Sequence, residues 1–358
     1  MNTLDNLKQI KKLDKNKVLE SIEMLGEQIN QAWQEASQIR IPESYKKVDK
    51  VFVCGMGGSA LGAHILRSVF FDQLKLPLFI VNDYQLPVSL GSKTLCVVSS
   101  YSGSTEESLA ALKEARKRGA KIFIITNGGS LADLVESGNL PGYVFSDSFN
   151  PSAQPRMGLG YSLGAQLALF RNLGFVKISF SEIEKCLAFV DRLQSHFGVS
   201  NLAAKNPAKQ LAKSLEKKMV IVVAAEFLAG NAHTLSNQLN ETAKVFAAYH
   251  LIPELNHHLL EGLTFPKSNQ SDLVFLFFES NLYYSRNKVR FSVTENVVAK
   301  NKVKYFNYQL VGRSEFEQSL EMLLFGTYLT FYLAILNGVN PAKIPFVDYF
   351  KGQLKKYH

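Results

Sequence analysis

Short apolar segments alternate with amphipathic ones along the first half of the chain. The apolar segments occupy residues 51–54, 78–81, 95–99 and 121–126. Short apolar runs of this kind predict buried strands. An amphipathic pattern at 105–118 and a stretch rich in small residues at 157–173 predict helices, and a helical pattern covers residues 5–45. Because strands that alternate with helices indicate βαβ units, we expect a parallel sheet.

The second half of the chain repeats this order of elements without a residue-level repeat. A helix is predicted at 181–199, and a polar stretch at 201–207 follows it. Further strands are predicted at 219–225, 273–278 and 303–309, and further helices at 231–250 and 316–336. The fold class is therefore predicted to be α/β, with two domains that each contain a parallel sheet flanked by helices in three layers.

The chain of 358 residues is long enough for two domains of about 150 residues each. We predict an N-terminal helical segment at 1–45, a first domain at 46–175, a helical linker at 176–204 and a second domain at 205–358 that ends in a helix.

Composition excludes several classes of protein. Apolar residues make up 46% and charged residues 20%, which excludes disordered and collagen-like chains. Cys54, Cys96 and Cys186 are far apart and form no CxxC motif, so no disulfide framework, zinc site or redox pair is predicted. The N-terminal segment lacks the apolar region of a secretory signal. The apolar stretch 322–336 is shorter than the roughly 20 residues that cross a bilayer, and it predicts a buried helix. We expect a soluble, cytoplasmic protein.

The net charge of +9 favours an anionic partner. The basic residues are dispersed and form no long stripe with interleaved aromatic residues. A phosphorylated small molecule therefore fits the charge better than nucleic acid does, and no membrane partner is expected.

A glycine-rich loop, GMGGSA at 55–60, directly follows the first predicted strand. It matches the dinucleotide-binding fingerprint, and Asp83 could supply the acidic partner of that motif. This pattern would suit a nicotinamide-dependent dehydrogenase. The glycines also fit a simple tight turn between a strand and a helix, so the loop alone does not decide the function.

A second loop, SSYSGSTEE at 99–107, also lies between a strand and a helix. Its hydroxyl groups and the helix N-terminus are hydrogen-bond donors suited to a phosphate monoester. Ser104 and Glu107 alternatively match a capping box, which would leave Ser100, Ser102 and Thr105 unexplained. Two such loops on successive crossovers favour phosphate binding, and a dinucleotide-binding domain has no use for the second.

Four further residues are candidates for acid–base or electrostatic chemistry. Arg156 begins a predicted helix, where a cation is unfavourable unless it meets an anion; an exposed arginine is an equally good interpretation. Glu241 has Lys244 three residues on, so local sequence favours a solvated ion pair. His257 and His258 are adjacent in a loop, and a general acid/base role fits them better than a metal site.

Taken together, these motifs resemble those of the bifunctional phosphoglucose/phosphomannose isomerase family, which is built from two sugar-isomerase (SIS) domains. The matches run in order along nearly the whole chain: GMGGSA at 55–60, SYSGST at 100–105, PR at 155–156, NE at 240–241, PELNH at 253–257, TFYLA at 330–334 and GVNP at 338–341.

The resemblance implies an aldose–ketose isomerase that interconverts glucose 6-phosphate and fructose 6-phosphate through a cis-enediolate, without metal or cofactor. It implies that the sugar phosphate binds at Gly57, Gly58, Ser59, Ser100, Ser102 and Thr105. Glu241 would be the base that moves the proton between C2 and C1, and Arg156 would stabilise the enediolate. His257 would reach the site from the second subunit of a homodimer to assist ring opening, and Lys351 would act at the ring oxygen.

The sequence departs from the family pattern at three places. SYSGST replaces SYSGNT, and ELNHH replaces ELNHN. Ile344 stands where many members carry a threonine linked to mannose phosphate, so acceptance of mannose 6-phosphate is left open. Another SIS-type phosphosugar isomerase remains an alternative. A non-catalytic SIS module is another, and it would keep the serine loop without needing Glu241 and His257.

Overall fold

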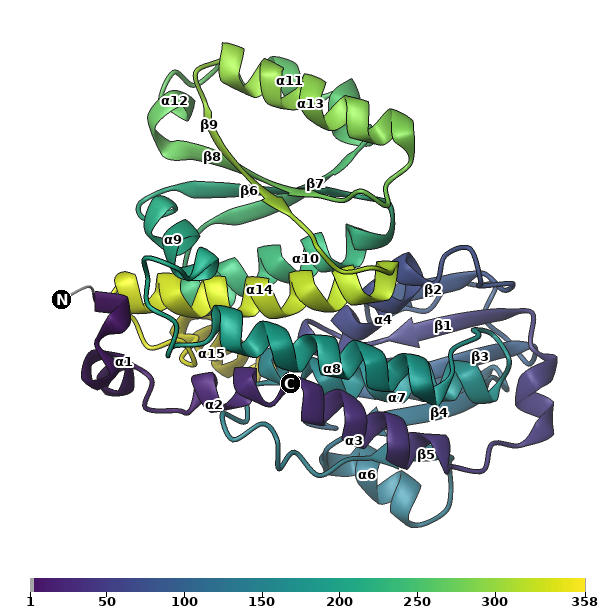
Figure 1. The fold of residues 1–358 in the computed structure, drawn as a ribbon. Coiled ribbons are helices and arrows are strands. Elements are labelled where there is room, and N and C mark those ends of the chain that lie inside the picture. The colour runs from purple at the N-terminus through teal and green to yellow at the C-terminus, as the bar shows by residue number, and fades with distance from the viewer. Residues whose placement is uncertain (1–2, 358) are drawn as a thin grey trace.

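The computed structural model describes residues 3–357, which form two parallel β-sheets with a layer of helices between them (Figure 1). The first sheet has the strand order β2-β1-β3-β4-β5. Its strands are β1 (Lys50–Cys54), β2 (Leu78–Val81), β3 (Thr94–Ser100), β4 (Lys121–Thr126) and β5 (Gly142–Val144). All of its neighbouring strands pair in parallel, as the alternation of strands and helices predicts.

The second sheet has the order β7-β6-β8-β9 and is also parallel throughout. Its strands are β6 (Met219–Ala225), β7 (Ala247–Ile252), β8 (Leu273–Glu279) and β9 (Lys304–Gln309). In both sheets the first strand lies between the second and the third, so the two domains share one topology. The predicted fold class is confirmed.

Helices cover both faces of each sheet, and further helices form the N-terminal region. Those up to the second sheet are α1 (Leu7–Leu13), α2 (Val18–Glu23), α3 (Leu25–Ser37), α4 (Gly58–Val69), α5 (Glu106–Lys117), α6 (Gly129–Glu136), α7 (Leu159–Asn172), α8 (Phe180–Phe197) and α9 (Pro207–Ser214). Those that follow are α10 (Ala229–Gln238), α11 (Leu259–Gly262), α12 (Asn269–Asp272), α13 (Ser285–Lys300), α14 (Glu315–Leu336) and α15 (Pro345–Leu354).

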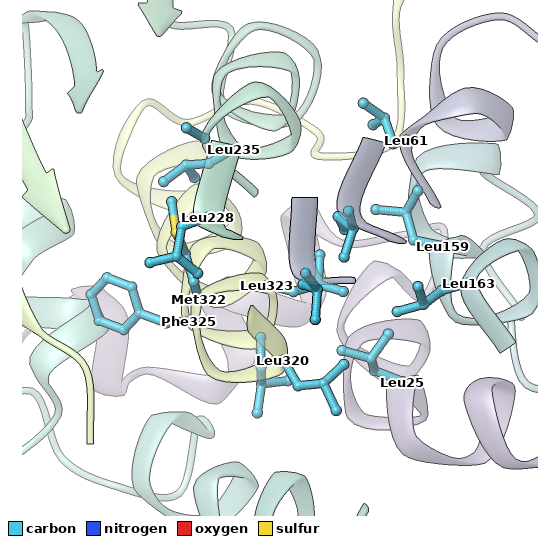
Figure 2. Packing of buried hydrophobic residues seen from close by; sticks show 14 of the residues in the cluster. Leu25, Leu61, Leu159, Leu163, Leu228, Leu235, Leu320, Met322, Leu323 and Phe325 are labelled. Atoms are coloured by element: carbon cyan, nitrogen blue, oxygen red, sulfur yellow. The ribbon is translucent and has the colours of Figure 1, made fainter. Parts of the chain in front are cut away.

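The layer between the sheets joins the two domains through leucine-rich helix faces. α4 packs on both α7 and α10, and α10 packs on α14. Figure 2 shows Leu320 and Leu323 of α14 close to Leu25 of the N-terminal segment and to Leu159 of the first domain. Gly230 permits the closest approach, because a Cβ there would lie 2.3 Å from the carbonyl oxygen of His64. The domains therefore share one continuous core.

α14 is long and apolar enough to cross a membrane by length and composition, and no other helix among residues 3–357 is. In the fold, 94% of its most apolar window is buried inside the protein. The prediction of a buried helix at this place is confirmed.

Two cysteines that are distant in sequence lie together below the phosphate-like loops. The sulfur atoms of Cys54 and Cys96, on the neighbouring strands β1 and β3, are 3.7 Å apart and hydrogen-bonded, and both cysteines are free thiols. The absence of a CxxC motif therefore did not exclude a thiol pair. Both side chains are buried, and hydrogen bonding and burial raise the pKa of Cys96, so both thiols are shielded from reaction.

The predicted helix at 231–250 is wrong in its second half. α10 ends at Gln238, a π-helical turn (Leu239–Ala243) follows, and residues 247–252 form β7. Lys244 ends the turn in the left-handed region, at φ 56°, and Phe246, two residues on, is 71% exposed. Glu241 thus lies in a π-helical turn, an arrangement often found at functional sites.

Candidate active site

The glycine-rich loop lies against the segment that carries Arg156. Gly57 has φ 47°, which glycine adopts at little cost, and α4 begins at the next residue. A Cβ at Gly58 would lie 2.9 Å from the backbone of Pro155 and 3.0 Å from the backbone nitrogen of Arg156. Glycine at this position therefore lets the first loop and Arg156 come together.

Ser59 links the glycine-rich loop to the serine-rich loop. Its hydroxyl accepts a hydrogen bond of 2.9 Å from the backbone N–H of Tyr101, and its carbonyl accepts one of 2.8 Å from the Ser99 hydroxyl. The two loops follow the adjacent strands β1 and β3 at the same edge of the sheet. The structure thus brings both sequence motifs into one site.

The serine-rich loop presents Ser102 and Thr105, while Ser100 supports it from below. The buried Ser100 hydroxyl donates to Thr105 Oγ1 at 3.1 Å and accepts from the Gly103 N–H at 3.2 Å. Ser102 is exposed, and its Oγ lies 3.5 Å from Thr105 Oγ1. Ser102 and Ser104 are exposed and Thr105 is half-buried, so a ligand can reach the hydroxyl groups of these three residues but not that of the buried Ser100.

The capping box proposed for Ser104 and Glu107 does not form. α5 begins at Glu106 with Thr105 as its N-cap, and the Thr105 side chain makes no capping hydrogen bond. The Ser104 hydroxyl donates to Ser102 Oγ at 3.3 Å instead. The helix-cap interpretation of this loop is wrong, which leaves anion binding as the better account of its hydroxyl groups.

The corresponding position in the second domain is filled by the chain itself. α13 follows β8 as α5 follows β3, and Glu226 of the loop after β6 lies at its N-terminus. The Glu226 carboxylate accepts hydrogen bonds from the Tyr284 N–H at 3.0 Å and from Asn287 Nδ2 at 2.6 Å. A carboxylate therefore occupies the place that the first domain leaves open to an anion.

Arg156 is buried between the domains and is only 3% exposed, so the interpretation as an exposed arginine is wrong. Its guanidinium donates to four oxygens: Thr242 Oγ1 at 3.2 Å, Gln154 Oε1 at 3.1 Å, and the carbonyls of Pro341 at 2.8 Å and Ala342 at 2.7 Å. Burial lowers its pKa, and the charges of Glu241 and Asp348 oppose that shift. The surroundings thus fix the cation in one orientation.

Glu241 pairs with Arg156 rather than with Lys244. Its Oε2 lies 3.5 Å from Arg156 Nη1, and its side chain is 33% exposed, so one side of the carboxylate faces solvent. The solvated pair with Lys244 that local sequence favoured is not formed, because Lys244 Nζ donates to the carbonyls of Thr242 at 3.1 Å and Asn340 at 2.9 Å. A carboxylate beside a fixed cation is suited to proton transfer next to developing negative charge.

Lys244 is a further cation of the site, which the sequence analysis named only as an ion-pair partner of Glu241. Partial removal from water, followed by the charge of Arg156, lowers its pKa to about 8, while Glu241 acts in the opposite direction. Its contact with Asn340 fixes the segment whose next two carbonyls, at Pro341 and Ala342, hold Arg156. The PR motif at 155–156 and the GVNP motif at 338–341 were recognised in the sequence. The contact between Arg156 and the carbonyl of Pro341 was not.

His257 lies far from Glu241 within one chain. Glu241 precedes the amino end of β7, whereas His257 ends a 3₁₀ turn (Glu254–His257) after its carboxyl end. The six residues of β7 span about 16 Å at roughly 3.3 Å per residue. One chain therefore does not bring Glu241 and His257 into one site.

Lys351 is exposed on α15, near the arginine site. α15 begins two residues after Lys343, which follows the Ala342 carbonyl bound to Arg156, and Asp348 of α15 acts electrostatically on Arg156. Lys351 lies three residues beyond Asp348, about one helical turn along. Among residues 3–357 no group of three or more His, Cys, Asp or Glu side chains is placed to hold a metal.

Comparison with known proteins agrees with this arrangement. Residues 44–133 match the SIS domain model, and residues 204–354 match the model of the bacterial phospho-glucose isomerase C-terminal SIS domain. A bifunctional phosphoglucose/phosphomannose isomerase of Caldicellulosiruptor bescii is 31% identical over 347 residues, which are 94% of this chain and 98% of the relative. This chain belongs to the bifunctional phosphoglucose/phosphomannose isomerase family.

Other members and one solved structure extend the comparison. The bifunctional phosphoglucose/phosphomannose isomerase of Thermoplasma volcanium is 30% identical over 320 residues, covering 88% of this chain and 96% of the relative. The crystal structure of a hypothetical protein from Thermus thermophilus superposes with a TM-score of 0.77 at 17% identity, over 98% of this chain and 93% of that one. The likeness to this solved structure is one of fold, and it extends over nearly the whole chain.

Proposed function

We propose that this protein isomerises glucose 6-phosphate and fructose 6-phosphate, and that Glu241 is the base. The observation that carries the proposal is the pairing of Glu241 with the buried Arg156 beside two loops suited to a phosphate. A non-catalytic sugar-phosphate sensor has no need for this pair, and a dehydrogenase has no need for the serine-rich loop.

In the proposed reaction, the phosphate binds at the N-terminus of α5, where Ser102 and Thr105 donate hydrogen bonds to it. Binding energy from this remote group holds C1 and C2 of the open-chain sugar at Glu241. The carboxylate takes the proton from C2 of the aldose and returns it to C1, and a proton moves between O1 and O2. The intermediate is a cis-enediolate, whose negative charge develops next to Arg156.

Arg156 makes a hydrogen bond or an ion pair through each of its three nitrogens before substrate arrives. When Glu241 turns toward the C2 proton, Nη1 loses its carboxylate partner and can donate to an enediolate oxygen. The proposal therefore links removal of the proton to release of a donor for the charge that this removal creates.

Ring opening needs a separate acid/base, and the proposal gives this task to His257 of the partner subunit together with Lys351. The position of His257 beyond the far end of β7 supports a site shared between two chains, because a base and a ring-opening group must contact the same small substrate. We therefore propose a homodimer, working in the cytoplasm.

A coupled assay of the purified protein tests the proposed function. Glucose, mannose and fructose 6-phosphates are compared, with and without a metal chelator. We expect glucose 6-phosphate to be converted at the same rate with and without chelator. The mannose 6-phosphate assay measures whether the protein with Ile344 at this position accepts the mannose substrate. No conversion of any of the three, or activity that chelator abolishes and zinc restores, would overturn the proposal.

A further inference from the structure

The C-terminal helix α15 has no buried residue, although it carries three large aromatic side chains. Phe346 is 87% exposed, Tyr349 is 67% exposed and Phe350 is 59% exposed. An isolated helix of ten residues is marginally stable in water, and apolar side chains grouped on a surface mark interaction sites. Residues 3–357 therefore leave the aromatic side chains of this helix uncovered.

A groove of about 1040 Å³ lies at the opposite end of the interdomain layer. α4 runs from the arginine site at Gly58 to Arg67 in this groove, and α10 runs from Ala229 in the groove to the turn that carries Glu241. The apolar part of the groove includes Phe71, which is 75% exposed, and Leu251 at the end of β7. The groove is thus remote from α15 of the same chain.

The groove and the helix carry opposite charges. Asp72, Glu226, Glu254 and Glu315 line the groove, against Arg67 and Lys75. Burial and the neighbouring carboxylates raise the pKa of Glu315. The negative charge of the groove is therefore not fully balanced by Arg67 and Lys75. From residue 345 to residue 357 the chain carries three lysines, at positions 351, 355 and 356, and one acidic residue, Asp348.

The shared site fixes which surfaces of two chains meet. His257 ends the 3₁₀ turn that begins at Glu254, and Glu254 lines the groove. α15 begins beside the arginine site, because Ala342 binds Arg156 and α15 starts at Pro345. Any contact that brings His257 of the partner subunit to Arg156 and Glu241 also brings the partner's groove toward α15.

We propose that α15 of each chain docks into this groove of a second copy, with its aromatic residues on the apolar part and with Lys355 and Lys356, which directly follow the helix, against the carboxylates. The inference rests on the proposed function, because the shared site supplies the relative placement of the two chains. A two-fold axis makes the contact twice in each dimer, as an isologous interface requires.

Charge reversal tests this docking with two variants that should dimerise only with each other. Variant one carries Lys355→Glu and Lys356→Glu, and variant two carries Asp72→Lys and Glu254→Lys. In a homodimer of either variant both helix–groove contacts bring like charges together, whereas both contacts of the mixed dimer are complementary. We expect dimerisation of each variant alone to weaken by at least about tenfold. Mixing should restore a one-to-one dimer, seen by sedimentation equilibrium and native mass spectrometry.

Phe350→Ser tests the apolar part of the contact, with Phe265→Ser as the matched control because Phe265 is 68% exposed and lies outside both surfaces. Only the α15 variant should dissociate, and circular dichroism checks that both variants stay folded. A monomeric wild type, charge variants that dimerise like wild type, or folded variants that fail to associate on mixing would each overturn the docking.

The activity assay separates this inference from the proposed function. A wild-type protein that converts glucose 6-phosphate while the surface variants keep wild-type dimerisation refutes the docking and leaves the function standing. A protein that obeys the mixing rule but converts no hexose phosphate refutes the function and leaves the docking surface standing.

Discussion

Glu241 and Arg156 come from different domains, yet the Glu241 carboxylate lies 3.5 Å from Arg156 Nη1. Arg156 belongs to a 3₁₀ turn (Pro155–Met157) before α7, and Glu241 belongs to the π-helical turn after α10. The pair therefore depends on the packing of the two domains through α4, α7 and α10, and the chemistry proposed here requires that interface to be intact.

Glu241→Gln should abolish most turnover while the protein stays folded. Glutamine keeps the shape and a hydrogen-bond acceptor for Arg156, but it cannot take a proton from carbon. We expect turnover to fall by roughly 10²–10⁴-fold or more. Exchange of the substrate C2 proton with deuterium from solvent, followed by NMR, should stop as well. Glu20→Gln is the control, because Glu20 is exposed on α2 and forms an ion pair with the exposed Lys17. Activity within a few-fold of wild type would return Glu241 to a structural role.

Ser102→Ala with Thr105→Ala should weaken binding of the phosphorylated sugar without unfolding the first domain. Each lost hydrogen bond to a charged group is worth about 1.5–3 kcal/mol, so calorimetry should show a loss of at least about tenfold in affinity. Ser285→Ala, at the start of α13, is the matched control because Glu226 already occupies that helix N-terminus. Equal affinities in the two variants would exclude the loop as the phosphate site.

The alkaline limb of the activity profile should depend on Lys244. Its pKa of about 8 lies below the ordinary value of 10.5, so the side chain loses its proton as pH rises through about 8. The neutral amine then binds the Asn340 carbonyl more weakly and loosens the segment that holds Arg156. We expect kcat/KM to fall above pH 8, and Lys244→Arg to move this fall to higher pH because guanidinium stays charged.

Lys244→Met should lower kcat/KM at every pH. Lys213→Met should keep the wild-type pH profile, because Lys213 is exposed. An unchanged alkaline limb in Lys244→Arg would show that another group sets it.

Acid stability should depend on His64, which lies at the contact of α4 with α10. Its ring is 4.5 Å from that of His233, and burial, followed by the charges of His233 and Arg67, lowers its pKa to about 4. The unfolded chain takes up the proton near the ordinary value of 6.5. The stabilisation is therefore complete above pH 6.5 and is lost as pH falls from 6.5 to 4, by up to about 3 kcal/mol.

His64→Gln should flatten that part of the curve of unfolding free energy against pH, measured by urea denaturation. His196→Gln is the control, because His196 is exposed. Equal slopes for wild type and His64→Gln between pH 6.5 and pH 4 would contradict this assignment.

The sequence predicted elements best where apolar runs and loops agreed. Val51 to Cys54 lead straight into glycines, and both the strand and the turn were correct. The strand β7 was missed because Leu235, Leu239 and Ala243 continued a helical pattern into it, and because a lysine at position 244 gave no sign of a left-handed conformation. The local sequence cannot show where a helix ends when tertiary contacts stabilise that end.

The sequence likewise predicted one part of the candidate site and missed another. The two phosphate-like loops were recognisable because their donors are adjacent in the chain. The partners of Arg156 were not, since Thr242, Pro341 and Ala342 reach it only through the packing of the domains. Lys244 is the nearest cation to Glu241 in sequence, so local sequence favoured it as the partner of that carboxylate. The inference was wrong because Arg156 reaches Glu241 from the other domain.

The proposed sharing of each active site between two subunits predicts how mixed dimers behave. His257→Ala and Glu241→Gln should each be nearly inactive as homodimers, because both sites of each dimer then lack one group. A heterodimer of the two variants has one site with both defects and one site with neither. Random pairing makes about half of the dimers mixed, so roughly a quarter of wild-type activity should return if the sites act independently.

The measurement mixes the two inactive variants after reversible dissociation and verifies subunit exchange by native mass spectrometry before the assay. A mixture of Glu241→Gln with Arg156→Lys is the control. Both of these residues belong to the same chain's site, so a mixed dimer keeps one defect in each site and no activity should return. Recovery in the first mixture and not in the second is the signature of a site completed by His257 of the partner subunit. If exchange is complete and neither mixture recovers, His257 does not act across the dimer, and the ring-opening group must come from the chain that carries Glu241.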